Sequence, residues 1–162
     1  MNALKKFNTV SIDKLLAPSL PPSVCPIEGP ICPIEGEFIG YKKCMVVKEG
    51  EILFVIVTLK IPADALRVSP FRNVHIGILI DYFETERSRK CRCSYAKVIK
   101  IESFDGKKQY QSAVSLFANN KLTYKVGEYV CADEFDDDIT EECSHGIHFF
   151  MTRKEAEEYM CY

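Results

Sequence analysis

The chain has 162 residues, of which 47% are hydrophobic and 27% charged, ordinary values for one globular domain with a buried core. A net charge of -2 excludes a strong overall attraction to nucleic acid or to acidic membranes. The chain has no run of about 18 apolar residues, which argues against a membrane span, and no N-terminal secretory signal, so its eight cysteines are expected to be cytosolic free thiols.

The first 34 residues are expected to form a proline-rich N-terminal arm, and residues 35–162 a single compact β-rich domain. The segment "APSLPPSVCPIEGPICPIEG" (17–36) is dense in proline and glycine. Proline fixes φ and removes a backbone donor, so this segment can be neither a helix interior nor a central strand. The arm should therefore contribute less to folding than the rest of the chain.

Beyond the arm the pattern is that of strands. Residues 51–61, "EILFVIVTLKI", have apolar side chains on both faces of the expected strand, which predicts burial on both sides. Residues 74–83 and 95–104 alternate in polarity and predict two more strands. Asp105-Gly106 predicts a hairpin with a type I′ turn, and residues 109–117 are expected to be its returning strand.

A further strand is expected over residues 122–131. Five to seven strands joined mostly by short turns favour a mainly β (α+β) fold. We expect a compact antiparallel barrel-like or bent sheet with a C-terminal capping helix.

The stretch "CSHGIHFFMTRKEAEEYM" (143–160) predicts an entry turn, a closing strand and a helix. Thr152 followed by Glu155 has the form of a capping box, so the helix should begin near Arg153. His148 should lie in the strand, largely buried and with a bonded ring nitrogen, because burying an unpaired polar group is costly. His145 should lie in the turn and be exposed.

Two chemical alternatives share this stretch. Cys143 could be a nucleophile with His145 or His148 as its base, but neighbours on one strand point in fixed alternating directions, and the preceding acidic run would raise a thiol pKa. A metal site could join Cys143 and a histidine to Cys91 and Cys93, but Cys-x-Cys lacks the spacing of a zinc knuckle. We therefore expect no catalytic residue, metal or cofactor.

Two charged clusters remain. The seven carboxylates between Asp133 and Glu142 lack the spacing of a calcium-binding loop and predict a solvated loop. A basic cluster precedes and enters the next expected strand, and such clusters can hold phosphate or nucleic acid. Its members are Arg87, Arg89, Lys90 and Arg92.

Three motifs resemble a viral and phage domain of unknown function that is also found appended to pentapeptide-repeat proteins. They are Ile-Pro-x-Asp-Ala-x-Arg at 61–67, Arg-Lys-Cys-Arg at 89–92 and Cys-Ser-x-Gly-Ile-His-Phe-Phe at 143–150. The resemblance covers about residues 35–159, and it implies no activity, ligand or site residue. Relative to that pattern, a segment at about 68–89 is inserted here, and insertions on a scaffold commonly carry partner surfaces.

These observations favour a non-enzymatic viral accessory or virion-associated protein that acts through protein contacts, in the cytoplasm of the infected host or in the virion. Two alternatives stay open. One is a binder of a small anionic ligand, or an enzyme, with a pocket built from Arg67, Arg92, Cys143 and His148, since arginine binds anions bidentately and histidine has a tunable charge. The other is a nucleic-acid-binding module that uses the basic cluster.

Overall fold

The protein is described from a computed structural model, which covers residues 32–75, 83–87, 90–116 and 121–159. Most of the expected arm therefore lies outside the described residues, although Cys32, near its end, is buried in the core. The strands are β1 (Phe38–Lys48), β2 (Glu51–Ile61), β3 (Arg67–Val68), β4 (Phe71–His75), β5 (Phe83–Arg87), β6 (Cys91–Cys93), β7 (Tyr95–Ser103), β8 (Ser112–Val114), β9 (Thr123–Lys125), β10 (Tyr129–Cys131) and β11 (Ile147–Phe149). One helix follows, α1 (Arg153–Glu158).

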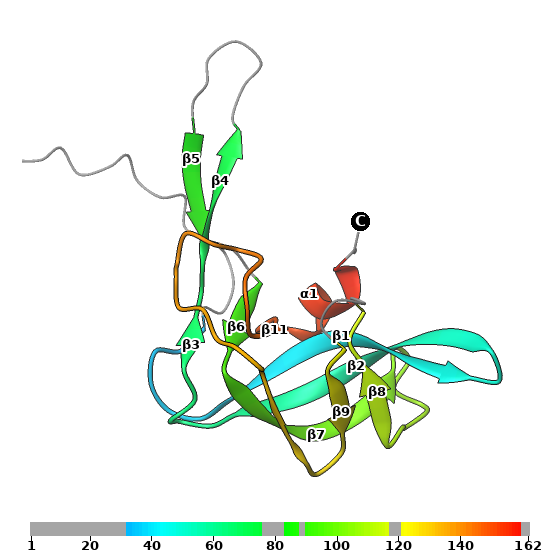
Figure 1. Cartoon of the computed structure of the whole chain (residues 1–162). Helices are drawn as coiled ribbons and strands as arrows, with labels where there is room; N and C mark the ends of the chain where they lie inside the picture. The colour runs from blue at the N-terminus through cyan, green and yellow to red at the C-terminus, as the bar shows by residue number, and fades with distance from the viewer. Residues whose placement is uncertain (1–31, 76–82, 88–89, 117–120, 160–162) are drawn as a thin grey trace, which may run out of the picture.

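The main sheet is antiparallel and six-stranded, in the order β10-β7-β2-β1-β8-β9. Figure 1 shows β1 and β2 at its centre as a long, curved pair. Among the described residues no pairing joins the edge strands β10 and β9. The mainly β prediction is thus confirmed in its bent-sheet form, and the sheet is not a closed barrel.

The hairpin turn with positive φ at both central residues lies between β1 and β2, not where the sequence predicted it. Glu49 has φ 53° and Gly50 has φ 83°, the geometry of a type I′ turn. At Asp105-Gly106 only the glycine has positive φ, and the Asp105 carboxylate instead accepts hydrogen bonds from Ser103 and Lys107. The prediction of a type I′ hairpin there is wrong.

The expected returning strand also pairs elsewhere. A single bridge joins Glu102 to Gln109, after which the chain leaves β7. β8 pairs instead with β1, through Met45 and Val114, on the opposite side of the β1–β2 pair. β7 is flanked by β2 on one edge and by β10 on the other, whereas β8 takes the edge of β1 that β2 leaves free.

The expected strand over residues 74–83 is also corrected. Its two ends belong to different strands, since Val74 pairs with Glu84 and His75 with Phe83 in an antiparallel β4–β5 hairpin. Residues 76–82, between them, lie outside the described part of the chain. In Figure 1 this hairpin projects away from the rest of the molecule.

The core side chains come from both the main sheet and a second, three-stranded sheet of order β11-β6-β3. On β2 one face is buried as predicted, through Val55, Val57, Leu59 and Ile61. On the other face only Ile56 is buried, while Ile52 and Phe54 are 59% and 53% exposed, so the prediction of burial on both sides is wrong there.

Helix α1 begins as the sequence predicted. Thr152 is its N-cap, and the reciprocal bonds of the capping box with Glu155 are both present. Ala156 is buried against Ile56 and Phe150 on the outer face of the sheet. No helix of the described part of the chain is long and apolar enough to span a membrane.

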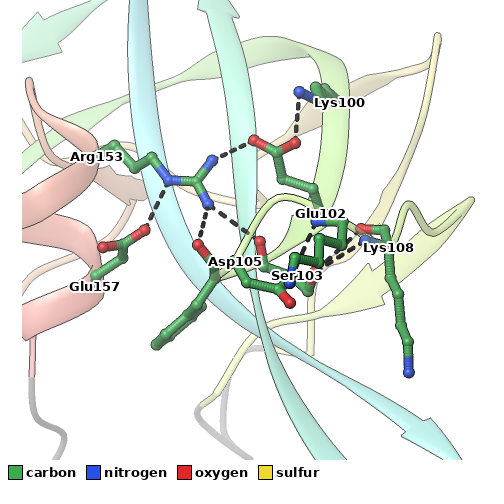
Figure 2. Close-up of polar contacts among 9 residues, drawn as sticks. Lys100, Glu102, Ser103, Asp105, Lys108, Arg153 and Glu157 are labelled. Atoms are coloured by element: carbon green, nitrogen blue, oxygen red, sulfur yellow. Dashed lines mark hydrogen bonds and ion pairs between the residues drawn. The ribbon is translucent and has the colours of Figure 1, made fainter.

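Arg153 attaches the helix to β7, as Figure 2 shows. Its guanidinium forms an ion pair with the buried Glu102 and donates to the carbonyl oxygens of Ser103 and Phe104, at 3.1 and 3.0 Å. A second carboxylate, that of Glu157 one turn along the helix, lies 2.7 Å from Arg153 Nε. The helix is thus held by polar contacts at its start and by apolar packing further along.

Candidate functional site

Arg67, at the start of β3, is engaged by its own neighbourhood. Its guanidinium stacks on the ring of Phe38, with 5.0 Å between Cζ and the ring centroid. It donates, over 2.6 to 3.1 Å, to the backbone carbonyl oxygens of Gly36, Pro62, Ala63 and Ala65. Arg67 therefore fixes the turn between β2 and β3.

Arg92, in β6, is fully buried and binds the backbone of the acidic loop rather than its carboxylates. It donates to the carbonyl oxygens of Asp136 and Asp138, at 2.9 and 2.6 Å, and to that of Glu141. Gly146 passes beside it with φ 141°, where an added Cβ would lie 3.3 Å from the Arg92 side chain. Arg92 therefore stabilises the backbone of residues 136–141 from inside the loop.

The acidic loop builds its own turns around that support. The Asp136 carboxylate accepts from the Ser144 hydroxyl and the Asp138 amide, and these hydrogen bonds hold the pKa of Asp136 below its usual range. The Asp138 carboxylate accepts from the amide and hydroxyl of Thr140, which lower its pKa in the same way. Both carboxylates thus accept hydrogen bonds that stabilise the turns of this loop.

The basic cluster does not present a common surface in its described part. Lys90 is 8% exposed, and its ammonium nitrogen lies 3.0 Å from Cys143 Sγ and 3.3 Å from the Tyr159 hydroxyl. Arg92 is buried as described. The side chain of Arg87, in β5, and all of Arg89 lie outside the described part of the chain.

The two histidines differ as the sequence predicted. His145 is 65% exposed, and its Nε2 lies 3.6 Å from a Glu134 carboxylate oxygen. His148 lies in β11, where its side chain is half-buried, less than predicted, and its ring donates to the backbone carbonyl of Glu142. Its other ring nitrogen, Nε2, is buried and has no hydrogen-bond partner among the described residues.

His148 forms part of the wall of a small cavity, which lies where β1 lacks a continuous neighbour. On that edge β1 pairs with Phe150 at Tyr41 and with β8 at Met45. The cavity between these pairings has a volume of about 30 Å³. Its lining residues are Lys42, Lys43, Lys90, Leu116, His148, Phe150 and Tyr159.

Three lysines are among the residues that line this cavity. Lys42 donates to the carbonyl oxygen of His148 at 2.9 Å. Lys43 donates to the carbonyl oxygens of Glu157 and Tyr159, at 3.2 and 3.0 Å, near the end of α1. The site that the fold assembles is therefore made of lysines and His148, and neither Arg67 nor Arg92 lines it.

Sequence reasoning missed Lys42, Lys43 and Tyr159. The available signal was the lysine pair in "GYKKC", where two adjacent cations enter a strand that is otherwise largely apolar. Adjacent residues of a strand point to opposite faces, so the pair alone could not indicate a common site. Both residues nevertheless line the cavity, because the long side chain of Lys42 reaches the His148 carbonyl and that of Lys43 reaches the Glu157 and Tyr159 carbonyls.

The environment of His148 holds its ring neutral. Burial, and then the charges of Lys42, Lys90 and Arg92, together lower its pKa from 6.5 to about 3, although the hydrogen bond to Glu142 opposes them. Nδ1 carries the proton donated to Glu142, so Nε2 presents a lone pair.

We expect this histidine to make the fold less stable in acid. Between pH 6.5 and about 3 the unfolded chain binds a proton on His148 that the folded chain does not, so this contribution is complete above pH 6.5 and is lost as the pH falls. His148→Gln should therefore flatten the dependence of unfolding free energy on pH by about 1.4 kcal/mol per pH unit across that window. Urea melts from pH 7 to 4 measure it.

His145→Gln is the matched control, because His145 is exposed. It should leave the slope of stability against pH unchanged. Parallel slopes for wild type and His148→Gln would show that the His148 ring takes up its proton in the folded protein as readily as in the unfolded chain.

The metal alternative gains no support from the geometry. Cys91 and Cys93 are buried core residues that pair with Phe149 and Ile147 of β11. Burial raises the pKa of the Cys93 thiol to about 12. Within the described ranges no three histidine, cysteine or acidic side chains form a group that could hold a metal ion.

Comparison with protein families gives one decisive match. Residues 29–156, most of the chain, match the family of unknown function DUF5758. The chain belongs to this family. The matched region therefore includes the six-stranded and three-stranded sheets and most of α1, and it extends over the β4–β5 segment that we interpreted as an insertion.

The match confirms the resemblance to a domain of unknown function, and no finding bears on a viral origin or on the three motifs as family signatures. Neither the curated proteins nor the solved structures gave a match to this DUF5758 chain.

Proposed function

We propose that this DUF5758 protein is a non-enzymatic module that binds another protein through the exposed end of the β1–β2 hairpin. The observation that carries the proposal is an apolar strip on the outer face of that hairpin. Val47, Ile52, Phe54 and Phe104 are 62%, 59%, 53% and 40% exposed. Exposed apolar patches of this kind mark interaction surfaces more often than isolated apolar residues do.

The strip is continuous because its members are neighbours. Val47 and Ile52 are paired across the two strands. The Lys43 ammonium lies 5.2 Å from the centroid of the Phe54 ring and 5.4 Å from that of Phe104, so both rings lie beside the same group. Helix α1 packs on the same face, but over Ile56, and leaves this end uncovered.

The hairpin end also lacks neighbouring strands. The pairing of β2 with β7 begins at Val55, and that of β1 with β8 lies at Met45. Within the part of the chain that the structure describes, residues 51–54 and 46–48 therefore pair only with each other. A two-stranded ribbon with an apolar face gains stability when a partner covers it, because the apolar surface leaves water.

The alternatives have less support. Arg67 and Arg92 are engaged by backbone carbonyls on different elements, so an arginine pocket with Cys143 and His148 is not assembled. Lys90 and Arg92 of the basic cluster are buried, which leaves them unable to contact a nucleic-acid backbone. The setting of the protein contact, an infected cell or a virion, rests on the resemblance to viral and phage domains.

The test is site-specific photocrosslinking of the full chain in the cells that carry it. A photoreactive residue at Ile52 should give a discrete adduct with one protein, whereas the same residue at Ile139, 50% exposed in the acidic loop, should not. Phe54→Ser should weaken that adduct about ten-fold or more, as for a central interface aromatic. Equal adducts at both positions, or none at Ile52, would contradict the proposal.

A further inference from the structure

Two cysteines from distant parts of the chain meet in the core. Cys32 lies shortly before β1, Cys91 is the first residue of β6, and both are buried. They belong to one cluster of packed core residues, and their thiols form a hydrogen bond with each other. The two sulfur atoms are therefore direct neighbours, although residues 33–90 separate them in the sequence.

The other described cysteines differ from this pair. Cys44 and Cys93 are buried, whereas Cys131 and Cys143 are exposed. The Cys93 thiol interacts electrostatically with Cys32, but the hydrogen bond of Cys32 is with Cys91. A disulfide needs two sulfur atoms in contact with their side chains directed at each other, and the fold supplies this for Cys32 and Cys91.

The two thiols have different access to a reagent. Cys91 is 2% exposed, and the hydrogen bond with Cys32 and burial raise the pKa of its thiol, so it stays protonated at neutral pH. Cys32 is 8% exposed and lies within residues 32–37, which form neither helix nor strand. Because such segments open locally more easily than sheets do, Cys32 is the sulfur that a reagent reaches first.

We propose that Cys32 and Cys91 are a redox-active pair, which a small disulfide such as oxidised glutathione converts to an intramolecular disulfide. The Cys32 thiolate attacks one sulfur of the reagent, forms a mixed disulfide and releases one glutathione thiol. Cys91 then loses its proton to solvent, with the Ser69 hydroxyl 3.3 Å from its sulfur, and attacks the Cys32 sulfur to displace the second glutathione. The two protein thiols lose two electrons and two protons in total, and these reduce the reagent to two thiols.

The position of the bond gives it a structural effect. β6 is the central strand of the three-stranded sheet, so the disulfide joins the segment that enters β1 to the middle of that sheet. The loop that it closes contains β1 to β5. Closing a long loop restricts the unfolded chain, and the oxidised protein should therefore resist unfolding better than the reduced one. This pair is separate from the apolar strip and goes beyond the proposed protein contact.

Peptide mapping of the full chain after equilibration with mixtures of oxidised and reduced glutathione tests the proposal. Free thiols are blocked with N-ethylmaleimide, and the protein is digested with trypsin and a glutamate-specific protease. Trypsin cuts between Cys91 and Cys93, and the second protease cuts between Cys25 and Cys32, so each possible pairing gives a different mass. The expected product is one cross-link, from Cys32 to Cys91, which dithiothreitol removes.

Urea melts of the oxidised and reduced forms give a second readout. Oxidation should raise the urea midpoint of the wild type, and Cys32→Ala should lose both this rise and the cross-link. Cys44→Ala is the matched control, because Cys44 is buried in the same core cluster, and it should keep both. The wild-type map and melts need no variant, so a misfolded variant does not obscure the result. A cross-link through Cys93 or Cys25, no cross-link at any glutathione ratio, or equal midpoints for the two wild-type forms would each overturn the proposal.

Discussion

Arg92→Met is expected to be among the most destabilising single substitutions in this chain. Methionine keeps much of the apolar stem but removes a guanidinium that donates to three backbone carbonyls of the acidic loop. Those carbonyls would then be left without their buried donor. Removing one partner from a buried charged contact costs about 3–5 kcal/mol, and we expect a loss of that order in the unfolding free energy, measured by urea melts.

Two further measurements locate the effect. Cleavage by a protease specific for acidic residues should become faster within residues 133–142, because the loop loses its internal support. Arg92→Lys keeps the charge but cannot reach three carbonyls at once, so its stability should lie between those of wild type and Arg92→Met. A loss below about 1 kcal/mol in Arg92→Met would mean that solvent satisfies the loop carbonyls equally well.

The features predicted well from sequence are local ones. The capping box of Thr152 and Glu155 depends on residues three apart, and the helix begins where it indicates. The difference between His145 and His148 also follows locally, because a strand alternates its faces after a turn. Such signals need no knowledge of which distant segments meet.

The errors came from pairings between distant segments. A strand over 109–117 could be expected, but its partner β1 lies more than sixty residues earlier, and nothing in its pattern selects β1 over β7. Ile52 and Phe54 have the composition of buried residues, yet no element covers that end of the hairpin. An apolar side chain can be buried by another part of the same chain or by another protein, and the sequence does not show which of the two covers it.

The candidate site was predicted least well. Arginine suits anions by its chemistry, which favoured Arg67 and Arg92, but the same five donors suit backbone carbonyls inside a turn. Which acceptors a buried arginine meets depends on tertiary packing. Of the four expected residues only His148 lines the cavity, while Cys143 contacts its Lys90. Lys42 and Lys43 line the cavity because β8 pairs with only part of β1.

Arg153→Met is expected to release helix α1 from the sheet. The helix has six residues, too few to be stable without tertiary contacts. The substitution removes the ion pair with Glu102 and two bonds to the carbonyls of Ser103 and Phe104, while Lys100 still neutralises Glu102 at 2.5 Å (Figure 2). Because Arg153 is partly exposed and Glu102 keeps one partner, we expect a loss of about 2 kcal/mol, less than for an isolated buried pair.

Lys154→Met is the matched control on the same helix. Its ion pair with Glu158 is 3.7 Å long and its side chain is 80% exposed, so the loss should stay below about 0.5 kcal/mol. Amide hydrogen exchange over residues 153–158 should accelerate in Arg153→Met and not in Lys154→Met, since only the former detaches the helix. A double-mutant cycle with Glu102→Gln then isolates the coupling of Arg153 and Glu102, and a coupling energy near zero would show that the carbonyl bonds and the packing of Ala156 hold the helix by themselves.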